Sequence, residues 1–121
     1  MTSVDSRGEA MYVYVAGPMS GPPAEYLANV TRLSAYARRL MDAGKCPINP
    51  AGDLLEGLAG DVPMTDQQYK RRSMDLLRLL AGREDAAMHV VATQHRDGSE
   101  SLGVRAEIDE CVRLGIPVVY P

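Results

Sequence analysis

The stretch YVYVAGPMSG, residues 12–21, joins a run of β-branched and aromatic residues to an abrupt Gly-Pro break. The run at 12–16 predicts a strand buried on both faces, and the break predicts a loop at its carboxyl end. Ligands of parallel α/β sheets bind beyond the carboxyl ends of the strands. We therefore expect the loop to contribute to a binding site, through Gly17, Pro18, Met19, Ser20 and Gly21.

The rest of the chain is predicted to alternate between helices and strands. Helical spacing of apolar residues predicts helices from Pro23 to the Gly44 exit, from a Thr65 cap to Leu80, and across residues 101–115. Short apolar runs predict strands at 46–48, 86–93 and 116–120. In the last helix, the side chains expected to face inward are Val104, Ile108, Cys111 and Val112.

This order of elements predicts an α/β fold of three layers. It is a flavodoxin- or Rossmann-like parallel sheet of about four to five strands with helices on both faces. Residues 12–121 are expected to form a single domain after a flexible tail at 1–11. The irregular stretch 49–64 predicts a loop with a helical turn, of the kind that often carries function.

Composition excludes several classes of partner. The chain has 13 basic and 16 acidic side chains, for a net charge of −3, so neither a nucleic-acid binder nor a membrane-surface binder is expected. The one basic run, KRR at 70–72, is interpreted as a solvated helix face. Without a signal peptide or a membrane span, the sequence favours the cytoplasm. Cys46 and Cys111 are interpreted as small buried hydrophobes, and no metal site is expected.

Glu107 is the first candidate for chemistry. On the last helix it borders the apolar stripe, so its carboxylate is partly desolvated and its pKa is expected to rise. The alternative is an edge carboxylate that pairs with Arg105, Arg113 or a lysine. Just before it, Ser101 and Gly103 stand where a loop becomes a helix, which suits either an anion site or ordinary N-capping by Ser99 or Ser101.

For three further side chains, a structural role is considered beside a functional one. Asp75 lies in mid-helix near Arg71 and Arg78, so a surface ion pair competes with a catalytic role. Tyr14 alternates with valines in the first strand and is expected to be a core residue whose hydroxyl finds one partner. His89 is expected to be a satisfied core histidine.

Four segments, in order, resemble the nucleoside 2-deoxyribosyltransferase-like superfamily, which includes 2'-deoxynucleoside 5'-phosphate N-hydrolases. They are YVAGPMSG (14–21), AGKCPINP (43–50), the aspartate of RSMDLLRLL, and SLGVRAEIDECVRLGIPVV (101–119). The resemblance runs from about Tyr12 to the end of the chain. A departure is the loop TQHRDGSE, which is extended before Ser101 and brings in Arg96.

The resemblance implies cleavage of the N-glycosidic bond of a nucleoside or nucleoside 5'-monophosphate, by hydrolysis or sugar transfer. It implies Glu107 as nucleophile, Tyr14 as the group that positions it, Asp75 at the base or sugar, and Ser101 at the 5'-phosphate. A carboxylate beneath C1' suits an oxocarbenium-like transition state, and a second acid would protonate the departing base. No cofactor is expected, and the family suggests a homodimer or higher homo-oligomer.

Two other classes of function remain open at this stage. One is a nucleotide-binding or sensing domain of the same fold without turnover. The other is a structural or accessory protein, which predicts that Glu107, Asp75 and Tyr14 do not come together.

Overall fold

The computed structural model describes residues 9–121. Its elements follow the predicted order, with two short helices inside the stretch that was expected to be mainly loop. They are β1 (Tyr12–Ala16), α1 (Pro23–Asp42), β2 (Cys46–Ile48), η1 (Pro50–Gly52), α2 (Asp53–Ala59), α3 (Asp66–Leu80), β3 (Ala86–Val90), α4 (Leu102–Leu114) and β4 (Val118–Val119).

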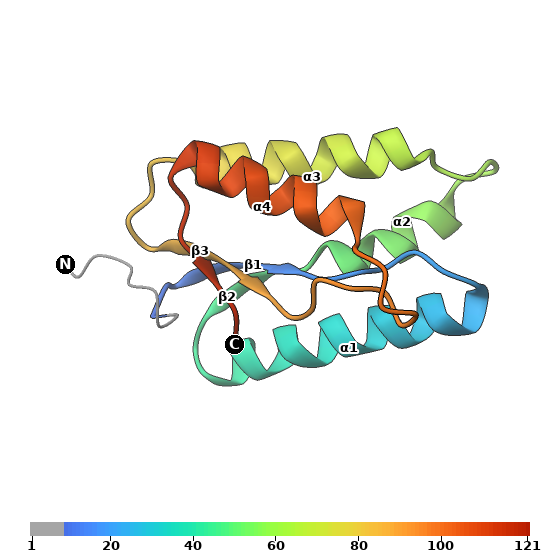
Figure 1. Cartoon of the computed structure of the whole chain (residues 1–121), viewed down its shortest axis with the longest axis horizontal. Coiled ribbons are helices and arrows are strands. Elements are labelled where there is room, and N and C mark those ends of the chain that lie inside the picture. Colours follow the sequence, from blue (N-terminus) through green and yellow to red (C-terminus); the bar gives the residue numbers. More distant parts are fainter. Residues whose placement is uncertain (1–8) are drawn as a thin grey trace.

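The four strands form one parallel sheet in the order β2-β1-β3-β4. Helix α1 covers one face, and α3 and α4 lie side by side on the other (Figure 1). This confirms the predicted α/β fold with helices on both faces. Strands β1 and β3 are adjacent at the centre, and the helices that follow them cover opposite faces. Such a reversal opens a crevice at the carboxyl ends of the two strands.

The alternation of side chains along β1 explains why both faces are apolar. Val13 and Val15 pack with Leu33 and Leu40 of α1. Tyr14 points to the opposite face, among the residues that α3 and α4 contribute. A central strand of a parallel sheet is covered on both sides, and its sequence is therefore a continuous run of apolar residues.

Gly17 ends β1 and allows a close approach between the loop and α1. A Cβ atom at this position would lie 2.5 Å from Cδ2 of Leu33, so a larger residue would push the strand end and the helix apart. The glycine therefore fixes where the loop 17–22 begins relative to the sheet.

The start of α3 follows from its cap. The Thr65 side chain accepts a hydrogen bond from the Gln68 amide, and the Gln68 side chain accepts one from the Thr65 amide. This capping box satisfies two amides that the first turn of the helix would otherwise leave unpaired. The predicted cap at Thr65 is thus confirmed.

Three expectations about burial and strand length are wrong. Cys46 is exposed because β2 is an edge strand. Val112 is 70% exposed, because it lies about 100° around α4 from the buried Cys111. Strand β3 ends at Val90 rather than Thr93, and the remainder turns into the loop before α4. Cys111 and His89 are buried, as expected.

The hydrophobic core also includes a residue that precedes β1. Ala10 is buried in the core, and its carbonyl accepts a hydrogen bond of 2.9 Å from Nζ of Lys45. The first eight residues of the expected tail lie outside the described residues. None of the helices in the described part of the chain combines the length and apolar character that crossing a bilayer requires.

Candidate active site

The central contact of the site joins Tyr14 of β1 to Glu107 of α4. The Tyr14 hydroxyl donates a hydrogen bond to Oε2 of Glu107, although 93 residues separate the two in the chain. Tyr14 is fully buried and Glu107 is partly buried. Glu107 forms no ion pair with an arginine or a lysine among residues 9–121, which is contrary to the alternative interpretation. Arg105 pairs instead with Glu100 and Asp109, and Arg113 pairs with Glu110.

Burial changes the acidity of both groups. It raises the pKa of Glu107 to about 7, and the hydrogen bond from Tyr14 partly opposes that rise by favouring the carboxylate. Burial and the nearby Glu107 raise the pKa of Tyr14 well above its ordinary value, so its hydroxyl stays a neutral donor. The pair therefore supplies a carboxylate that can gain or lose a proton near neutral pH.

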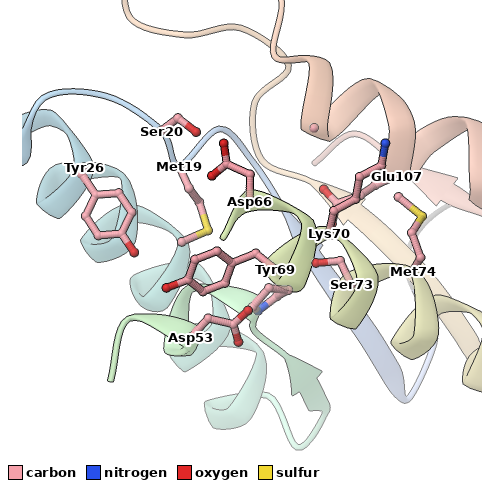
Figure 2. Close-up of a pocket in the computed structure, with 12 residues that line it drawn as sticks. Met19, Ser20, Tyr26, Asp53, Asp66, Tyr69, Lys70, Ser73, Met74 and Glu107 are labelled. Atoms are coloured by element: carbon pink, nitrogen blue, oxygen red, sulfur yellow. The ribbon is translucent and has the colours of Figure 1, made fainter. Parts of the chain in front are cut away.

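Glu107 opens into a pocket of about 370 Å³ beside α3, which we call the α3 pocket. Most of its lining is apolar or aromatic, with acidic groups at several points (Figure 2). The lining residues are Met19, Ser20, Tyr26, Pro50, Asp53, Asp66, Tyr69, Lys70, Ser73, Met74, Gly103 and Glu107.

A second pocket, of about 410 Å³, lies at the N-terminus of α4, and we call it the α4 pocket. It shares Met19, Ser20, Gly103 and Glu107 with the α3 pocket, so Glu107 stands where the two meet. The other lining residues come from the end of β1 and from the loop that leads into α4, including Gly17, His95 and Ser101.

Ser101 caps α4. Its hydroxyl accepts a hydrogen bond of 3.3 Å from the Val104 amide, which confirms one of the two predicted caps. The first-turn amides of a helix carry partial positive charge, and they attract anions. The α4 pocket therefore has an end suited to an anionic group.

The five loop residues that were predicted to bind a ligand, residues 17–21, lie in different places relative to the pockets. Met19 and Ser20 line both pockets, and Gly17 lines the α4 pocket. Gly21 lines a further hollow next to His95 and Arg96. Pro18 is fully buried and is absent from the linings of both pockets.

Asp75 does not join the site. Its side chain is 59% exposed and forms ion pairs with Arg71 at 3.9 Å and Arg78 at 3.4 Å. It is absent from the linings of both pockets, whereas Ser73, two residues earlier, faces the α3 pocket and interacts with the Tyr14 hydroxyl. The structure thus brings together Tyr14, Glu107, Ser101 and Gly103, but not Asp75.

Asp53 is the acid that sequence reasoning missed. It is 7% exposed and lines the α3 pocket at the start of α2. Nη1 of Arg72 lies 3.3 Å from Oδ1 of Asp53. The run KRR was interpreted as a solvated helix face, and that interpretation is wrong for Arg72. The available signal was its position: Asp53 lies in the irregular stretch 49–64, which follows the carboxyl end of the second strand.

Residues 9–121 contain no group of three His, Cys, Asp or Glu side chains placed to hold a metal ion. In comparisons with known proteins, no family model, no curated protein and no solved structure matches this chain.

Proposed function

We propose that the protein cleaves the N-glycosidic bond of a nucleoside or nucleoside 5'-monophosphate, with Glu107 as the nucleophile. The observation that carries this proposal is the hydrogen bond from the buried Tyr14 hydroxyl to the Glu107 carboxylate, at the junction of the two pockets. The resemblance to nucleoside 2-deoxyribosyltransferase-like proteins supports it.

The two pockets suit the two ends of a nucleotide. The aromatic and apolar lining of the α3 pocket fits a planar base. The α4 pocket, with the Ser101 cap and the free amides of the first turn, fits a 5'-phosphate. The sugar between them would then present C1' to Glu107.

In this mechanism the Glu107 carboxylate attacks C1' as the bond to the base breaks, and the positive charge that develops on the sugar is stabilised by the carboxylate. Tyr14 positions the carboxyl group and favours its ionised form. Attack on the sugar ester by water completes hydrolysis, and attack by a second base completes transfer.

The test is release of free base from a panel of nucleosides and nucleoside 5'-monophosphates, followed by chromatography. We expect Glu107→Gln to lower the rate by about 10³-fold or more, as loss of a nucleophile does. The matched control is Asp109→Asn, which changes an exposed carboxyl of the same helix that pairs with Arg105. That variant should keep its rate within about threefold, because a surface ion pair contributes little.

Release of base at an equal rate by the wild-type protein and Glu107→Gln would refute the proposal. Tight nucleotide binding in calorimetry, without base release or transfer from any substrate, would instead support a sensing domain of the same fold.

A further inference from the structure

A buried acid faces the α3 pocket from the side opposite Glu107. Figure 2 shows Asp53 reaching the pocket from α2 and Glu107 from α4, with Tyr69 and Ser73 of α3 between them in this view. Both carboxyls affect the Tyr14 hydroxyl electrostatically. The two acids therefore border the same space from different elements.

The surroundings of Asp53 mark the end of the pocket that suits a base. Tyr26 and Tyr69 line the same pocket. Burial raises the pKa of Tyr26, and the nearby Tyr69 and Asp53 raise it further. Two phenol rings beside a carboxyl offer stacking surface and a hydrogen-bonding group, which is what recognition of a planar heterocycle requires.

The contacts of Asp53 hold it in place without removing it from the pocket. Arg72 lies between two acids, with Nη1 at 3.3 Å from Asp53 and Nη2 at 2.5 Å from Oε1 of Glu56. The positive charge of the Arg72 guanidinium is thus shared between Asp53 and Glu56. Burial raises the pKa of Asp53 more than Arg72 lowers it, which favours retention of a proton.

We propose that Asp53, rather than Asp75, is the general acid that protonates the departing base. This inference rests on the proposed function. Of the three acids that line the α3 pocket, Asp66 is exposed at the start of α3, and only Asp53 and Glu107 are withdrawn from solvent. A desolvated carboxyl close to the base can deliver a proton in the transition state.

The step balances in both halves of the reaction. The bond between C1' and the base nitrogen breaks, its electron pair goes to the base, and the Asp53 proton moves to the base as Glu107 forms an ester with C1'. Water then attacks C1' and gives its proton to Asp53, while the ester electron pair returns to Glu107. The sum is nucleotide plus water giving free base and sugar phosphate.

The experiment compares two substrates that differ in how much their base needs a proton. One is the best natural substrate from the panel. The other is its analogue with a better leaving group, methylated at N7 for a purine or fluorinated at C5 for a pyrimidine. General acid catalysis contributes about 10²–10⁴-fold. We therefore expect Asp53→Asn to lower kcat by about 100-fold or more on the natural substrate and by less than about tenfold on the analogue.

Asp75→Asn is the matched control, because it makes the same change on the neighbouring helix in an exposed ion pair. It should leave kcat on both substrates within about threefold of wild type. Thermal unfolding of each variant checks that the fold is kept, and the ratio of the two rates does not depend on how much of the protein is folded.

Equal losses on both substrates in Asp53→Asn, or a leaving-group-dependent loss in Asp75→Asn alone, would overturn the assignment of Asp53 and leave Glu107 untouched. Inactivity of the wild-type protein on both substrates would overturn the proposed function itself and this inference with it.

Discussion

A single hydrogen bond connects the strand at the centre of the sheet with the helix that borders the site. Tyr14 cannot ionise near neutral pH because its pKa is raised, so it acts only as a donor to Glu107. Donation to a carboxylate is worth about 1.5–3 kcal/mol where the acceptor is charged. The ionisation of Glu107 should therefore depend on this one hydroxyl.

Tyr14→Phe tests that dependence. The wild-type rate should rise with pH through the Glu107 pKa of about 7, since the carboxylate is the reactive form. Loss of the donor removes an interaction that lowers this pKa, so the midpoint should move to higher pH. The measurement is kcat/KM against pH for both proteins. An unchanged midpoint would contradict the positioning role.

At this scale, periodicity predicted that Tyr14 lies in a buried strand and that Glu107 borders the apolar stripe of its helix, whereas the resemblance alone implied that the two act together. Asp53 was missed because its burial depends on where the fold places the start of α2 and on Arg72, which lies about twenty residues further along the chain. Asp75 had the residue type that the resemblance implies, but the phase of α3 turns it outward, toward Arg71 and Arg78.

At the scale of elements, two helices begin with the same kind of cap but in different surroundings. Thr65 caps α3 at an exposed position, whereas Ser101 caps α4 in a buried position that lines the α4 pocket. A hydroxyl that caps a helix and faces a pocket can serve both the helix and an anion.

Ser101→Ala and Thr65→Ala separate these two roles. Each variant should lose about 1 kcal/mol in the free energy of unfolding, because each removes one cap. Only Ser101→Ala should also weaken binding of a nucleoside 5'-monophosphate, by about tenfold relative to the same nucleoside without phosphate. Denaturant unfolding and calorimetry measure the two effects, and an equal loss of affinity in both variants would argue against a phosphate at α4.

The main helices and strands were predictable because their apolar spacing is sustained over several turns or residues. The stretch 49–64 was not, since η1 and α2 are short and are held by local contacts such as the Asn49 side chain accepting from the Ala51 amide. Short helices of this kind depend on packing more than on intrinsic propensity.

At the scale of the whole molecule, the two sides of the sheet differ in the titratable groups that they bury. Tyr14 and Glu107 lie on the face covered by α3 and α4. The face covered by α1 contains the buried His89, whose Nδ1 lies 2.6 Å from the Tyr36 hydroxyl. Nε2 of His89 has no partner among residues 9–121, and burial lowers the pKa of this histidine.

His89 should make the fold sensitive to acid. Its folded pKa lies below its ordinary value of 6.5, so the unfolded chain binds the proton more readily and stability falls as the pH drops below 6.5. Glu107 has the opposite effect, because its raised pKa favours the folded state as the pH falls from 7 to 4.5. The effect of His89 on stability is therefore best measured in the Glu107→Gln background, where Glu107 no longer titrates.

In that background, adding His89→Gln should flatten the dependence of the free energy of unfolding on pH below 6.5, since glutamine retains a hydrogen-bonding group for Tyr36 but does not titrate. Denaturant unfolding at several pH values measures the slope. A slope that is the same with and without His89 would show that other groups govern acid sensitivity.

The α/β class and the presence of helices on both faces were predictable from the alternation of elements and the apolar strands. The strand order was not, because it depends on which edges the crossing helices leave open. That order places β1 beside β3 and the loop 17–22 beside the loop before α4, so the site depends on an arrangement that no single segment encodes.

The most direct test of the account is covalent trapping of Glu107. A nucleotide substrate that carries fluorine at C2' of its sugar slows the breakdown of a glycosyl ester. Intact-mass spectrometry should then show one added sugar phosphate, located by peptide mapping on Glu107 and absent from Glu107→Gln. An adduct on another residue, or one that forms equally in Glu107→Gln, would contradict the claim that this carboxylate attacks the sugar.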